Sequence, residues 1–324
     1  MFYCYNYCGD DMKNKKLLKT AITVIIVIIT CYLIYDNYYL IANKLEYLYS
    51  KYIKENVKQT LNSNEYQKNE NYEYVKINKN AKVKEKDDIK NAIYTFLDNG
   101  WNKYILKCDS KYETCLDDFK SIVENNVFLT DLSNFVHPFN TFNKINTTFT
   151  STGNIILKKE DRYKKNEIEK INKKIDQIYN ENYDKNKTIE ENIKTFHDYI
   201  INTTKYDKTN TSGNSNVSSS TAYGVLFDGI GICSGYSDAM SLFLDKMKIK
   251  NYRISSDTHE WNLVYINGVW KHLDLTWDDP ITSDDSDIIS HDYFLIDEDV
   301  LKSKSDKEHL FNENVYKEAK KAVN

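Results

Sequence analysis

One cysteine, one histidine and one aspartate in the second half of the chain have the types and order that covalent catalysis requires. Cys233 stands in the stretch GIGICSGYSDAM (229–240), which holds three of the nine glycines in the chain. His259 precedes the run EWNLVYI, and Asp274 follows the run VWKHL. A thiolate nucleophile, an imidazole base and a carboxylate that orients the imidazole are the groups needed for acyl transfer through a covalent intermediate.

The residues after Cys233 predict a helix with one buried face. Apolar side chains recur at helical spacing, at Met240, Phe243, Leu244 and Met247. Cys233 is therefore expected at or near a helix N-terminus, where unpaired N–H groups and the helix dipole favour a thiolate. The glycines before it would permit a tight entry from strand to helix. The alternative is that Cys233 is a small buried core residue, the commoner role of a lone cysteine.

Three runs, NYRISS, THEWNLVYI and VWKHLDLTW, predict consecutive strands. Asn267-Gly268 joins the last two and is a strong signal for a two-residue hairpin turn. The register that follows from this turn puts His259 and Asp274 on one sheet face as diagonal neighbours, and a slip of one residue would separate them. The opposite face is apolar and is expected to be buried: Val264, Ile266, Val269, Leu273 and Leu275.

The other histidines lack this relation to a cysteine and a carboxylate. His272 shares the predicted face of His259 but lies closer to the turn. A structural or surface role is expected for each of them: His137, His197, His272, His291 and His309.

The motifs GICSGY, HEWN and LDLTWDDP, in this order, resemble the bacterial transglutaminase-like superfamily, whose fold is similar to that of papain-like cysteine peptidases. The resemblance spans residues 193–296. It implies an α+β core in which the helix bearing the cysteine packs on an antiparallel sheet. It also implies Cys233 as nucleophile, His259 as base and Asp274 as orienting acid. Glu260 departs from the family pattern, but it should face away from His259.

The implied chemistry is acyl transfer from an amide of a protein or cell-wall peptide through a thioester. An amine or water would then accept the acyl group, and the sequence leaves this choice open. Tyr206 and Trp261 are guesses for the second oxyanion donor beside the Cys233 N–H. Asp278 and Asp279 are better explained by a turn before Pro280 than by a metal, and no cofactor is expected. The alternative function is a non-catalytic binding or scaffolding module at the cell surface.

Residues 17–35 (LLKTAITVIIVIITCYLIY) are long and apolar enough to cross a membrane. Lysines gather at the N-terminal end of this segment, which predicts a cytoplasmic N-terminus and an extracytoplasmic C-terminal domain. We expect a retained single-pass anchor in the cell membrane. The alternatives are a cleaved signal peptide and a lipoprotein modified at Cys31, for which Thr30 fits poorly.

The remaining composition limits partners and organisation. The net charge is −4, and no basic patch indicates nucleic-acid binding. Cys108 and Cys115 could form a disulfide or remain free thiols, and no second Cys/His pair has zinc-ligand spacing. The expected order of parts is a cytoplasmic N-terminus (1–16), a transmembrane anchor (17–35), a juxtamembrane spacer (36–86), a small α+β domain (87–160) and the transglutaminase-like domain (161–324).

Overall fold

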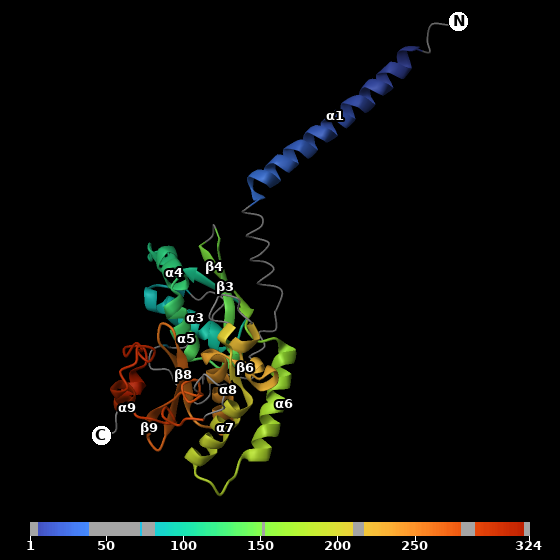
Figure 1. Ribbon diagram of the computed structural model, residues 1–324. Helices are drawn as coiled ribbons and strands as arrows, with labels where there is room; N and C mark the ends of the chain where they lie inside the picture. Colours follow the sequence, from blue (N-terminus) through green and yellow to red (C-terminus); the bar gives the residue numbers. More distant parts are fainter. Residues whose placement is uncertain are drawn as a thin grey trace. The chain divides into compact units, whose positions relative to one another are not determined.

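The computed structural model describes residues 6–38, 72, 82–150, 153–209, 217–279 and 289–320. The chain separates into two compact units, residues 1–57 with 149–154, and residues 58–148 with 155–324 (Figure 1). Most of the predicted spacer (36–86) lies outside the described residues. The predicted boundary near residue 160 stays a prediction.

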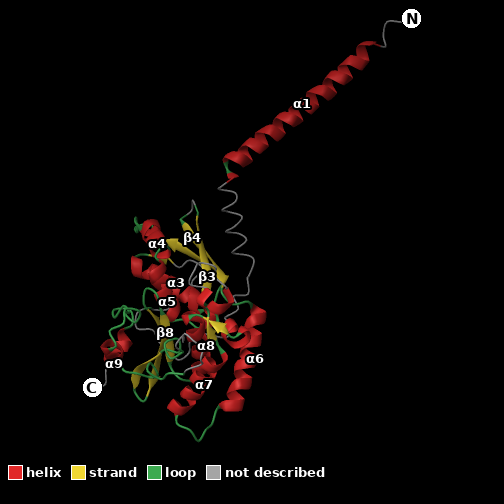
Figure 2. Cartoon of the chain, viewed as in Figure 1, coloured by secondary structure: helices red, strands yellow, loops and turns green. Residues whose placement is uncertain are grey.

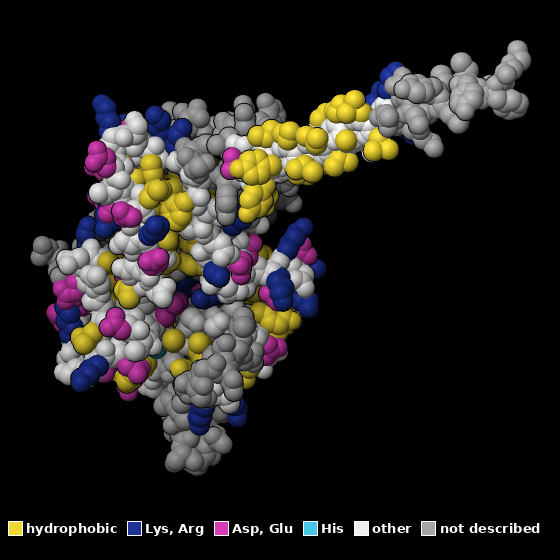
Figure 3. All heavy atoms as spheres, turned by 90° about the horizontal axis from the view of Figure 1, so that it is seen from above, with side chains coloured by type: hydrophobic (Ala, Val, Ile, Leu, Met, Phe, Trp, Pro, Cys, Tyr) yellow, Lys and Arg dark blue, Asp and Glu magenta, His cyan; other side chains and the backbone are white. Residues whose placement is uncertain are grey.

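The first unit contains helix α1 (Asn6–Asp36). Its segment Lys15–Asp36 is 22 residues long, about 33 Å at 1.5 Å per residue. Apolar side chains cover this part of the helix, and basic side chains lie toward its N-terminal end (Figure 3). By length and composition α1 can therefore span a membrane, although a signal sequence would have the same properties.

The second unit begins with helices packed beside a four-stranded sheet of order β1-β2-β4-β3. The strands β3 and β4 form a hairpin, and the tip of that hairpin (151–152) lies outside the described residues. The bounds of this part are β1 (Lys82–Val83), α3 (Lys86–Asp98), β2 (Lys103–Cys108), α4 (Cys115–Val123), α5 (Asn126–Asn134), η1 (Pro138–Asn140), β3 (Phe142–Phe149) and β4 (Asn154–Asp161).

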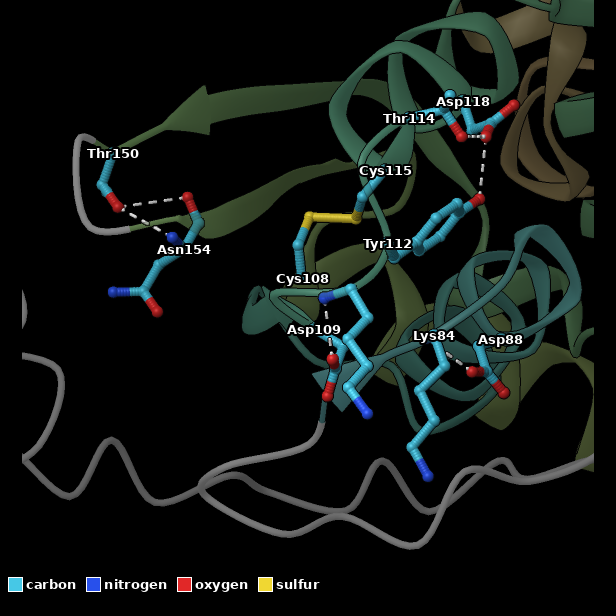
Figure 4. Close-up of a disulfide and its surroundings, with 11 residues drawn as sticks. Lys84, Asp88, Cys108, Asp109, Tyr112, Thr114, Cys115, Asp118, Thr150 and Asn154 are labelled. Atoms are coloured by element: carbon cyan, nitrogen blue, oxygen red, sulfur yellow. Dashed lines mark hydrogen bonds between the residues drawn. A yellow bond between two sulfur atoms is a disulfide. The ribbon is translucent and has the colours of Figure 1, made fainter.

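A disulfide joins Cys108 at the end of β2 to Cys115 at the start of α4 (Figure 4). The intervening loop is also held by Asp118, whose carboxylate accepts hydrogen bonds from the Tyr112 and Thr114 hydroxyls. Of the two states that the sequence left open for this cysteine pair, the structure has the bonded one.

The rest of the second unit is built around helix α8 (Cys233–Lys246). This helix packs between the sheet of β7, β8 and β9 and the helices α6 (Lys165–Asn182) and α7 (Ile189–Thr203) (Figure 2). A capping box fixes the start of helix α7: the Thr188 hydroxyl accepts the Glu191 N–H, and the Glu191 carboxylate accepts the Thr188 N–H.

The three-stranded sheet has the register predicted from the Asn267-Gly268 turn. Asn267 and Gly268 have φ values of 52° and 88°, as a two-residue turn with two left-handed positions requires. In the described ladder Ile266 pairs with Val269, and Leu263 pairs with His272. The predicted apolar face is buried in the core except at Val269, which is only partly covered. The strands are β7 (Asn251–Ser255), β8 (Glu260–Ile266) and β9 (Val269–Leu273).

A buried ion pair joins β7 to helix α8 and to the end of α5. Arg253 on β7 donates to Asp238 on α8 at 2.6 Å and to the carbonyl oxygens of Ser133 and Val136. The Tyr163 hydroxyl donates to the other oxygen of Asp238 at 2.5 Å. The contacts of one guanidinium therefore reach from the cysteine-bearing helix to the end of α5.

Candidate active site

Cys233 is the first residue of α8, and its thiol is partly exposed. The chain enters this helix from β6 (Ile230–Gly231), which pairs with β5 (Lys205–Tyr206). The Ser219 carbonyl accepts the Ile232 N–H just before the helix, and Gly235 lies so close to the same carbonyl that a Cβ would overlap its oxygen. Gly235, two residues after Cys233, therefore allows the backbone before α8 to approach the first turn of this helix closely.

His259 and Asp274 lie just beyond the adjacent ends of β8 and β9. Nε2 of His259 is 2.6 Å from Oδ2 of Asp274, and both side chains are buried. The second oxygen of Asp274 accepts the N–H groups of Thr276 and Trp277. These contacts leave Nδ1 of His259 as the ring nitrogen that Asp274 does not engage.

The electrostatics of the site favour a charged imidazole. Burial by itself lowers the pKa of His259, but the charge and hydrogen bond of Asp274, together with the Cys233 thiol, raise this pKa well above its ordinary value. Burial likewise opposes ionisation of Asp274, yet His259 and His309 hold the pKa of its carboxyl far below the ordinary value. Asp274 therefore accepts a hydrogen bond from Nε2–H of His259. The Cys233 thiol interacts with the same ring.

The structure thus brings together Cys233, His259 and Asp274, the three residues selected from the sequence. It adds His309 to these three residues, although a structural or surface role was expected for His309 from the sequence. Nε2 of His309 is 2.8 Å from Oδ2 of Asp274, the same oxygen that His259 contacts. The prediction that His309 lacks a relation to the carboxylate of this site is therefore wrong. No motif around His309 indicated the contact.

The two guesses for the second oxyanion donor have different outcomes. Trp261 is wrong, because its indole is buried and its N–H donates to Nδ1 of His272 at 3.0 Å. This bond matches the neutral state of His272, whose pKa is lowered to about 3 by burial and by His309. The pKa of Tyr206 is raised by burial and then by the charge of Cys233, and its role as donor stays a prediction.

Glu260 faces away from His259 as expected. Its carboxylate accepts the Ser237 hydroxyl of α8 at 2.6 Å and lies 3.6 Å from Nε of Arg253. This departure from the family pattern is accommodated because the alternation of β8 points Glu260 toward the helix.

Asp278 has a structural partner in His197. Nε2 of His197 lies 3.2 Å from Oδ2 of Asp278, and its Nδ1 lies 2.9 Å from Asp198. The other carboxylate oxygen of Asp278 accepts the Tyr293 N–H. These bonds tie the loop after Asp274 to helix α7. Asp279 accepts the Tyr236 hydroxyl, and Pro280 lies outside the described residues.

Two groups of described residues have the types and proximity for a metal ion: His197, Asp198 and His291, and His259, Asp274 and His309. The contacts inside them are 2.6 to 2.9 Å, which are hydrogen-bond lengths. Ligand atoms around a tetrahedral zinc would stand about 3.3 Å apart at ordinary bond lengths. In the first group the Lys194 ammonium also lies 2.7 Å from His291. Both groups fit hydrogen bonding better than metal binding.

Comparison with known proteins gives no close relative. No family model matches the chain, and no curated protein matches its sequence. A solved structure described as "Crystal structure of a TGase" is similar over 57% of this chain and 54% of that one, with 13% identity and a TM-score of 0.30. The chain thus spans about half the length of that structure. At this level the likeness carries no assignment.

Proposed function

We propose that this chain is a membrane-anchored, extracytoplasmic cysteine acyltransferase or peptidase of the transglutaminase-like class. It would act on amides of proteins or cell-wall peptides through a thioester at Cys233. The position of the His259 ring supports the proposal. Its Nε2 lies 2.6 Å from Oδ2 of Asp274, and the ring interacts with the Cys233 thiol at the start of α8.

The proposed reaction begins with a Cys233 thiolate and a His259 imidazolium. Sγ attacks the amide carbon, and the carbonyl electrons move to oxygen. When this oxyanion collapses, the C–N bond breaks, the leaving amine takes the proton from His259, and a thioester remains. Neutral His259 then takes a proton from an incoming amine or water, whose attack releases Sγ as the thiolate. Asp274 keeps its charge throughout and stabilises the imidazolium.

The test is to trap the thioester in the full chain kept in detergent. A glutamine-rich protein such as casein is offered with a dansyl-labelled primary amine, and amine incorporation and ammonia release are measured separately. Incorporation indicates transamidation, and ammonia without incorporation indicates hydrolysis. Cys233→Ala should abolish both while leaving thermal unfolding unchanged.

Reactivity of the thiol provides a substrate-independent arm of this test. Iodoacetamide near pH 7 should label Cys233 faster than Cys31, an exposed free cysteine of α1. Equal slow labelling of both thiols, together with no turnover on protein or peptide amides, would reject catalysis and favour the binding module.

The membrane location is supported by α1 and by the disulfide Cys108–Cys115, a bond typical of oxidising compartments. Fractionation of cells tests the anchor, and the mass of the N-terminal peptide distinguishes a retained helix from a cleaved signal. Protection of the C-terminal unit from protease added to intact, wall-stripped cells would contradict the proposed sidedness.

A further inference from the structure

The carboxylate of Asp274 is shared by two imidazoles. Nε2 of His259 lies 2.6 Å from Oδ2, and Nε2 of His309 lies 2.8 Å from the same atom. The second imidazole comes from the segment after α9 (Glu298–Ser303). His309 is 35 residues beyond Asp274 and lies outside the stretch that carries the family resemblance.

His309 is held rigidly from its other side. Its Nδ1 lies 2.7 Å from Oδ1 of Asp306, and the same oxygen accepts the His309 backbone N–H at 2.9 Å. The ring of Tyr293 stacks on it at 5.0 Å between centroids, and Trp261 and Trp277 pack around it at 4.8 and 5.2 Å. The side chain of His309 is 2% exposed. An imidazole so enclosed has one orientation, and that orientation aims Nε2 at Asp274.

The hydrogen-bond roles follow from the partners. A carboxylate can only accept, so Nε2 of His309 donates to the ionised Asp274. Asp306 also acts as an acceptor, since it receives a backbone N–H. Both ring nitrogens of His309 therefore face carboxylate oxygens. The titratable groups around this ring in the described chain are Asp274, Asp306, His259, His272 and Tyr293.

We propose that His309 is a positioning residue for the thiolate–imidazolium pair, acting through Asp274. Its N–H is a second donor to Oδ2 beside that of His259, so that the carboxylate cannot rotate and His259 keeps the ring orientation that serves Cys233. This inference rests on the proposed function, because it assigns a role within the same site. His309 touches neither the thiol nor a reacting atom, and Asp306 in turn orients His309.

The test compares two amides at one position in the full chain. His309→Gln places its amide N–H near the site of Nε2 and can still donate to Asp274. His309→Asn reaches only the site of Nδ1, so it can contact Asp306 but not Asp274. The rate of Cys233 alkylation by iodoacetamide is measured from pH 5 to pH 9 by mass spectrometry of the Cys233 peptide.

For His309→Asn we expect the rate at pH 6 to fall roughly 10- to 100-fold, the effect of losing one charge-assisted hydrogen bond. The inflection of the measured profile should move to higher pH. His309→Gln should retain the wild-type profile. Asp306→Asn, which alters a partly exposed residue and not the buried ring, should shift the profile in the same direction by a smaller amount.

His137→Asn is the matched control. His137 is also a largely buried histidine beside a carboxylate, 3.5 Å from Asp245, but Asp245 is twelve residues along α8 from Cys233, roughly 18 Å at the helical rise. Its profile should be unchanged.

The outcomes separate the two proposals. A wild-type chain without selective Cys233 reactivity or turnover would refute the proposed function itself. A reactive wild type whose profile is unmoved by both His309→Asn and Asp306→Asn would refute the positioning role alone. Equal loss in Gln and Asn with the inflection unmoved would also refute it, because packing would then be what His309 supplies.

Discussion

Nε2 of His259 lies 2.6 Å from Oδ2 of Asp274, and neither residue belongs to a strand. Strand β8 begins one residue after His259, at Glu260, and strand β9 ends one residue before Asp274, at Leu273. The hairpin holds its two open ends at the spacing of paired strands, and the pair forms where regular pairing stops. His259 interacts with Cys233 from this position beyond β8, while Glu260, the first residue of β8, points toward α8.

Asp274→Asn should lower acyl transfer by roughly 10²- to 10⁴-fold, because His259 loses its orienting acceptor. Asp274 raises the pKa of His259, so its neutralisation lowers that pKa. The imidazolium that protonates the leaving amine then loses its proton at a lower pH than in the wild type. The alkaline limb of the profile of kcat/KM against pH therefore shifts to lower pH.

The control for this variant is Asp292→Asn, which neutralises an exposed carboxylate and should leave the pH–rate profile in place. An alkaline limb that stays fixed in Asp274→Asn would contradict the coupling of Asp274 to His259.

Gly235→Ala should destabilise the fold by about 1–3 kcal/mol through overpacking against the Ser219 carbonyl. It should also slow alkylation of Cys233, because relief of the overlap moves the first turn of α8. Gly268→Ala is the comparison, since its Cβ meets nothing within 4 Å while its φ of +88° still imposes strain. Denaturant unfolding and alkylation rates are measured for both, and a Gly235 variant that behaves like Gly268→Ala would show that the close approach is unimportant.

Arg253→Met should cost about 3–5 kcal/mol of unfolding free energy, because it leaves the buried Asp238 carboxylate without its ion-pair partner. Asp238→Asn added to this variant should recover part of the loss by removing the unpaired charge. Urea unfolding of the single and double variants measures both effects.

The exposed pair Lys165–Glu169, at 4.0 Å, supplies the contrast for the buried one. Lys165→Ala should change stability by less than about 0.5 kcal/mol. An Arg253 variant as mild as this control would mean that the guanidinium does not join α8 to the end of α5.

Reduction of Cys108–Cys115 should lower stability by roughly 2–3 kcal/mol, the loop-entropy value for a ring of this size. The measurement is the shift in thermal unfolding caused by a phosphine reductant. The double variant Cys108→Ser/Cys115→Ser should unfold at the temperature of the reduced chain and be insensitive to the reductant. A reductant effect that persists in the double variant would assign the shift to another group.

The local features of the fold could be predicted from short stretches of sequence. The capping residues of α7 and the Asn267-Gly268 turn act over a few residues, so their effects are visible in the chain itself. The turn also sets the strand register, and the register brings Asp274 near His259. The start of α8 at Cys233 followed from helical spacing alone.

The sequence by itself therefore determined the three candidate catalytic residues and the elements that carry them. Only the tertiary structure decided their surroundings: the donation of Trp261 to His272, the bond of Tyr163 to Asp238, and the contact of His309 with Asp274. The last two join residues 75 and 35 positions apart. Such contacts depend on the path of the whole chain and on which buried polar groups lack other partners, and neither is encoded in a local period or turn.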